Sequence, residues 1–165
     1  MKKVLFLTLA LVMVFTLAAC GDNSGNNIKG GDTMSNISED SQESTIKDIR
    51  IKLAFNNDEV IVKMYDNPTS RDFLTLLPLT LEFEDYAGVE KISYLPRKLS
   101  TEDAPSGSNP EIGDLTLYAP WGNLAIFYKD FGYANGLIKL GKIESGLEKL
   151  ADMKGDFTVK IAKKD

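Results

Sequence analysis

The stretch Gly113-Asp-Leu-Thr-Leu-Tyr-Ala-Pro-Trp-Gly-Asn-Leu-Ala-Ile-Phe-Tyr128 carries the clearest fold signal in this chain of 165 residues. Residues 114–118 and 123–128 are rich in apolar and aromatic side chains, which is typical of strands. Pro120-Trp121-Gly122 lies between them and is a turn signal. The stretch therefore predicts two strands joined by a short turn.

Strand signals continue toward the N-terminus. Apolar and polar residues alternate on both sides of the polar turn Asn56-Asn57-Asp58, as they do in a β-hairpin. Asn67 is a good N-cap, and Pro68 suits the first position of a helix. The elements expected on this side are a hairpin over residues 49–65, a helix from Pro68 to Pro78, a strand over 79–85 and a short strand over 92–94.

Toward the C-terminus, polar and glycine-containing loops separate further strands. The elements expected there are a loop over residues 100–112, the strands 114–118 and 123–128, a loop over 129–136, a strand over 137–143, a helix over 145–153 and a strand over 157–161. Many short strands with two short helices predict a mainly β fold, a closed or nearly closed β-barrel capped by helices.

The order of these elements is similar to that of the cyclophilin fold. Leu137-Ile-Lys-Leu-Gly-Lys-Ile-Glu-Ser-Gly-Leu-Glu-Lys-Leu150 resembles the cyclophilin strand that ends in Phe-Gly-Lys-Val and leads into the last helix. The Gly113–Tyr128 stretch looks still more like the small bacterial cyclophilin-like family, which has a Gly-Asp, a Pro-x-Gly-Asn turn and an apolar run ending in Phe. The resemblance covers residues 47–163 and implies a cyclophilin-like closed β-barrel.

The chain departs from the catalytic cyclophilins it resembles. They share a Phe-His-Arg-Val-Ile strand, whereas this chain has no histidine and carries Glu82-Phe83-Glu84-Asp85 there. Their Gly-Ser-Gln-Phe-Phe strand corresponds to Gly122-Asn-Leu-Ala-Ile-Phe127. Only the apolar wall around Phe127 has an obvious counterpart, so no catalytic residue is assigned.

The candidate binding residues are Tyr94, Arg97, Trp121, Asn123 and Phe127. Trp121 lies in a turn, where an aromatic side chain can anchor a ligand. Phe131 and Tyr133, on a glycine-containing loop, are a further interface signal. The leading hypothesis is a module that binds a peptide or small molecule. The alternatives are a weak peptidyl-prolyl isomerase that assists exported proteins and a structural partner in an envelope complex.

The N-terminus resembles a bacterial lipoprotein signal. Lys2 and Lys3 precede an apolar run over residues 4–19, which is shorter than the roughly 20 residues of a spanning helix. Leu17-Ala-Ala-Cys20 looks like a lipobox, where a diacylglycerol is attached to the cysteine and the chain is cut before it. Because Cys20 is the only cysteine, it has no disulfide partner. We therefore expect residues 1–19 to be a signal peptide and Cys20 to carry the lipid.

Residues 20–45 are rich in Gly, Asn, Ser and acids, and they predict a flexible tether that spans roughly 25–30 Å. Residues 46–165 are expected to form one domain. Loss of the signal peptide leaves 17 basic against 24 acidic residues, so the net charge of −5 becomes −7. This charge argues against a nucleic-acid partner, and no cofactor or metal pattern is present in the sequence. The expected location is the extracytoplasmic face of the cell membrane, where the lipid anchor makes the membrane a partner.

Overall fold

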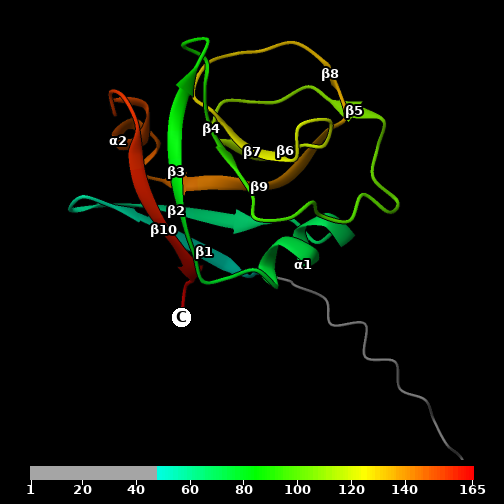
Figure 1. The fold of residues 1–165 in the computed structure, drawn as a ribbon, viewed down its shortest axis with the longest axis horizontal. Coiled ribbons are helices and arrows are strands. Elements are labelled where there is room, and N and C mark those ends of the chain that lie inside the picture. Colours follow the sequence, from blue (N-terminus) through cyan, green and yellow to red (C-terminus); the bar gives the residue numbers. More distant parts are fainter. Residues whose placement is uncertain (1–47) are drawn as a thin grey trace, which may run out of the picture. The chain divides into compact units, whose positions relative to one another are not determined.

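The computed structural model describes residues 48–165, and they form a closed β-barrel (Figure 1). Its strands are β1 (Arg50–Phe55), β2 (Asp58–Met64), β3 (Leu79–Tyr86), β4 (Glu90–Tyr94), β6 (Asp114–Tyr118), β7 (Asn123–Phe127), β9 (Leu137–Ser145) and β10 (Phe157–Lys163). They pair antiparallel around the ring in the order β1-β10-β3-β4-β7-β6-β9-β2. The expected mainly β barrel with two helices is confirmed.

Two short helices add side chains to the core of the barrel. α1 (Pro68–Leu74) and α2 (Leu147–Ala151) lie on opposite sides of the barrel in Figure 1. Phe73 of α1 and Leu150 of α2 are fully buried among the inward side chains of the strands. Each such side chain contributes about 1.5–3 kcal/mol of hydrophobic stabilisation. The helices therefore form part of the core.

Helix α1 is shorter than the sequence predicts, because the helix ends at Leu74 rather than at Pro78. Asn67 caps it as expected, since its Oδ1 accepts a hydrogen bond of 2.8 Å from the backbone N–H of Ser70. The Asn67 Nδ2 group also donates to the carbonyl oxygen of Lys139 on β9 at 3.0 Å. The same side chain thus starts the helix and ties it to the barrel.

The two expected loops each contain a two-residue strand, β5 (Gly107–Ser108) and β8 (Ala134–Asn135), and these pair with each other. A Cβ atom on Gly107 would collide with the carbonyl oxygen of Ala134, so only glycine allows this approach. Two residues are too few to show an alternating pattern, which is why the sequence predicts only loops here.

The hairpin of β6 and β7 separates an inner from an outer face. Leu124 and Ile126 point into the barrel core, whereas Ala125 and Phe127 belong to a second, smaller apolar cluster with Ile92 and Leu137. Side chains alternate between the faces of a strand, so this second cluster lies on the outside of the barrel wall. Its residues form the floor of the site described below.

The expectations for residues 1–47 lie outside the described residues. They are the signal peptide over 1–19, the lipid on Cys20 and the tether over 20–45. In residues 48–165, no helix is long and apolar enough to cross a membrane.

Candidate functional site

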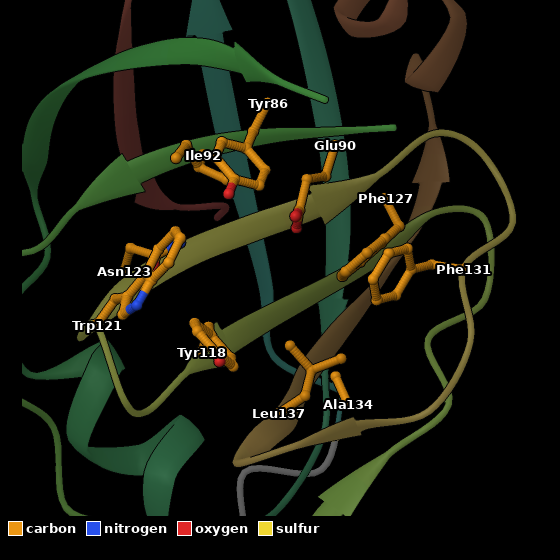
Figure 2. Close-up of a pocket in the computed structure, with 10 residues that line it drawn as sticks. All are labelled: Tyr86, Glu90, Ile92, Tyr118, Trp121, Asn123, Phe127, Phe131, Ala134 and Leu137. Atoms are coloured by element: carbon orange, nitrogen blue, oxygen red, sulfur yellow. The ribbon is translucent and has the colours of Figure 1, made fainter. Parts of the chain in front are cut away.

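A pocket of about 230 Å³ opens on the outer face of the barrel (Figure 2). It is lined by Tyr86, Glu90, Ile92, Tyr118, Trp121, Asn123, Phe127, Phe131, Ala134 and Leu137. They come from strands β3, β4, β6, β7, β8 and β9, from the turn between β6 and β7, and from the loop before β8. The pocket therefore lies on the barrel wall, and the β6–β7 turn and the loop before β8 form part of its rim.

The floor of the pocket is apolar and well packed. Ile92, Phe127 and Leu137 are almost completely buried. Across the strand pairs, Ile92 lies opposite Ala125, and Leu137 lies opposite Tyr118. This regular pairing holds the floor in one arrangement before any ligand arrives.

The walls of the pocket are aromatic. The Trp121 ring meets the Tyr86 and Tyr118 rings edge to face, with centroids 5.6 and 5.3 Å away. The Phe131 ring packs on Phe127 at 5.7 Å. Trp121 and Phe131 are each about half exposed, at 48% and 49%. Large apolar side chains exposed around one hollow are typical of binding sites.

Asn123 has a buried polar atom with no partner. The side chain is only 2% exposed, and its Nδ2 group donates to the carbonyl oxygen of Leu124 at 2.9 Å. That bond fixes which amide atom is the oxygen, and the Oδ1 has no hydrogen-bond partner among the described residues. An unsatisfied buried acceptor costs about 1–3 kcal/mol, which makes this atom a candidate contact for a ligand.

Glu90 is the only carboxylate that lines the pocket within the described chain. Figure 2 shows the side chain directed into the space between the aromatic rings. Within residues 48–165 the carboxylate has no hydrogen-bond or ion-pair partner, and burial raises its pKa above the usual value. An ionised carboxylate without a partner in a half-buried apolar setting is energetically unfavourable.

Three of the five residues predicted from the sequence line the pocket, namely Trp121, Asn123 and Phe127. Tyr94 and Arg97 do not line it. Tyr94 pairs with Asn123 across β4 and β7, but its side chain is 56% exposed.

Arg97 is held by helix α1 instead. Its Nη2 and Nη1 groups donate to the two oxygens of Asp72 at 2.6 and 2.9 Å, and Nη2 also donates to Thr75 at 3.0 Å. The hydrogen bonds from Arg97 hold the pKa of Asp72 below its usual value. The guanidinium group is thus occupied away from the pocket.

Sequence reasoning missed Glu90 and Tyr86. The expected strand over 92–94 begins two residues earlier in the structure, at Glu90. Extending the strand would have placed Glu90 on the same face as Ile92, because side chains two residues apart share a face. The alternation of side chains along residues 90–94 is thus the sequence signal that could have indicated Glu90.

The fold and the outer-face pocket define a class, the closed eight-stranded barrel of the cyclophilin type. The model of the cyclophilin-like family matches residues 53–162, and the chain belongs to that family. No curated protein matches the chain. Among solved structures, it is similar to a hypothetical protein of Archaeoglobus fulgidus studied in solution. The two share 16% identity with a TM-score of 0.55, over 73% of this chain and 98% of the other. That likeness shows the fold.

Proposed function

We propose that this protein is a lipid-anchored, extracytoplasmic binding module that holds a small molecule or a peptide segment in the outer-face pocket. The observation that carries the proposal is the pocket itself, which has an apolar floor, half-exposed aromatic walls and an unsatisfied buried acceptor on Asn123. Pockets of this composition are the usual form of a ligand site. The lipobox-like Leu17–Cys20 segment supports the anchored location.

Binding is favoured over isomerase catalysis because the pocket has no cationic donor. Prolyl isomerisation is helped by a positive donor placed near the imide nitrogen. No lysine or arginine lines the pocket in the described part of the chain, and Arg97 is paired with Asp72.

We expect the full chain to leave the isomerisation of a proline-containing peptide at its uncatalysed rate, because that donor is missing. A protease-coupled assay measures this rate directly. An acceleration proportional to the protein concentration would contradict the binding proposal and favour an isomerase. Its loss in the Arg97→Ala variant would assign the activity to that guanidinium group.

Ligand binding is expected to change the fluorescence of Trp121, which is the only tryptophan in the chain and lines the pocket. We expect at least one member of a peptide and metabolite screen to give a saturable change and to raise the unfolding temperature. A ligand at one hundred times its Kd stabilises the folded state by about 2.7 kcal/mol.

The control for this screen is a variant in which the pocket is filled. Ala134→Leu adds a branched side chain to the pocket lining and should abolish the fluorescence response. Ala162→Leu, on strand β10 and outside the pocket, adds the same atoms and should leave the response intact. Equal responses from both variants would place the ligand elsewhere and contradict the proposed site.

A further inference from the structure

We infer that the pocket selects a protonated organic amine, whose ammonium group lies between the aromatic rings and against the Glu90 carboxylate. This inference rests on the proposed function and adds the chemical class of the ligand. Its starting point is a carboxylate that faces an aromatic hollow and has no cationic partner in the described chain (Figure 2).

The aromatic rings provide the first part of the recognition. A cation within about 6 Å of a ring centroid is attracted by the electron-rich face, most strongly for Trp. The Trp121 plane makes angles of 86° and 79° with those of Tyr86 and Tyr118. Tyr86, Tyr118 and Trp121 all line the pocket, and because Trp121 is stacked parallel to neither tyrosine, the ring faces point in different directions. An ammonium group in this hollow can meet more than one ring.

The charges around the pocket provide the second part of the recognition. Lys91 and Lys129 come from elements that contribute to the pocket, but both are engaged elsewhere. Lys91 pairs with Asp85 at 2.6 Å, and the Lys129 ammonium lies 5.6 Å from the centroid of the Tyr128 ring. Nearby, Glu84 on β3 is paired in register with Ile92 of the pocket floor and is exposed. The stem of Lys98 lies beside Gly122 in the β6–β7 turn, but Lys98 does not line the pocket, and Glu90 is the one charged residue of the lining in the described chain. The setting therefore favours a positive ligand and disfavours an anion.

The unsatisfied Asn123 oxygen adds a further requirement on the ligand. This buried Oδ1 atom can only accept a hydrogen bond, so its natural partner is an N–H or O–H donor. Asn123 lies opposite Tyr94 and Glu90 lies opposite Phe127, so the two residues are four positions apart along β7, about 13 Å of strand. One ammonium group therefore contacts Glu90, and the Asn123 oxygen is left for a second N–H or O–H donor of a longer ligand.

The size of the pocket limits the ligand to a small group. Its volume of about 230 Å³ is below the roughly 300–1,000 Å³ of pockets that hold drug-sized molecules. A short alkylamine fits this space, and so does the end of one lysine side chain from a peptide. Both sources present the same chemistry, a protonated amine on a short apolar stem.

The test uses three probes of the same shape and different charge, namely isoamylamine, isoamyl alcohol and isovalerate. Each is titrated into the full chain, purified in non-ionic detergent, at neutral pH, with Trp121 fluorescence as the readout. We expect the amine to bind at least tenfold more tightly than the alcohol, and the acid to bind most weakly. Nα-acetyl-lysine methylamide is a probe for the lysine side chain of a peptide. Whichever of the two amines binds more tightly shows whether the pocket prefers a free alkylamine or a lysine side chain.

Glu90→Gln is expected to remove the preference for the amine and to leave the alcohol affinity within about twofold, because Gln keeps the shape and loses the charge. Glu148→Gln, on α2 outside the pocket, removes the same charge and should change neither the amine affinity nor the alcohol affinity. Equal binding of amine and alcohol to the unmodified chain would overturn this inference while leaving the proposed binding function standing. A pocket that binds no ligand in the wider screen would overturn both.

Discussion

Asp114→Ala is expected to lower the free energy of unfolding by about 2–4 kcal/mol. The Asp114 side chain is completely buried and forms ion pairs with Lys139 at 2.8 Å and Lys142 at 3.0 Å. It also accepts a hydrogen bond of 2.9 Å from the backbone N–H of Glu111. Breaking a buried pair costs about 3–5 kcal/mol. The two lysines are about 28% and 33% exposed and can turn to water, which lowers the expected cost.

Urea unfolding of the variant and the unmodified chain gives this difference in free energy. The matched control is Glu111→Gln, which removes another acid that contacts the same two lysines. The Glu111 side chain is 73% exposed, and exposed ion pairs contribute only about 0–1 kcal/mol. A loss for Asp114→Ala no larger than that for Glu111→Gln would refute the buried network as a source of stability.

The Asp114 network also gives the Gly-Asp of the sequence motif a structural explanation. Gly113 has a positive φ of 90°, a conformation that glycine adopts readily. Its N–H donates to the carbonyl oxygen of Phe127 at 2.7 Å, and its carbonyl accepts from Ile143 at 2.8 Å. Gly113 and Asp114 thus join β6 to β7 and β9 at one end of the barrel. The Gly-Asp motif therefore has a structural role in the barrel.

Most of the fold could be predicted from sequence because barrel strands leave a local pattern. The alternation in residues 49–65 and the Pro120-Trp121-Gly122 turn each predict a hairpin, and the structure has both. Closure of the ring has no local pattern, since it depends on β1 pairing with β10 near the other end of the chain. The number of short strands favours a closed or nearly closed barrel, and the resemblance to the cyclophilin-like family also implies closure.

The candidate site could be predicted only where strand and turn patterns reach it. Asn123 and Phe127 lie on one face of one strand, and Trp121 lies in the adjoining turn. Arg97 was predicted for the pocket, but it pairs with Asp72, which lies 25 residues away in the chain. No local pattern indicates such a long-range pair. Glu90 lies two residues before the strand expected over 92–94. Only the structure shows that its carboxylate has no partner among the described residues.

The binding proposal and the anchoring proposal depend on different parts of the chain. The pocket belongs to the barrel in residues 48–165, whereas the anchor depends on the sequence around Cys20. A tether that spans roughly 25–30 Å would place the barrel clear of the lipid headgroups. A small ligand could then reach the pocket from solution. The anchor can therefore be tested without disturbing the pocket.

Cys20→Ala is expected to abolish lipid attachment completely, because the thiol of Cys20 is the only one in the chain. Each buried methylene contributes about 0.8 kcal/mol to membrane binding, and two acyl chains hold a protein stably. In a bacterial host given labelled fatty acid, the unmodified chain should incorporate the label and lose residues 1–19. The variant should incorporate none and should keep those residues, as the mass of the purified protein will show.

Two further measurements make this prediction decisive. Ser24→Ala changes the expected tether without touching the thiol, so it should incorporate the label as the unmodified chain does. A thiol-reactive probe should not label the mature unmodified chain, because Cys20 is then a thioether. A mature chain that keeps a free thiol and takes up no fatty acid would rule out the lipid anchor. The pocket proposals would stand in that case, because they depend on residues of the barrel.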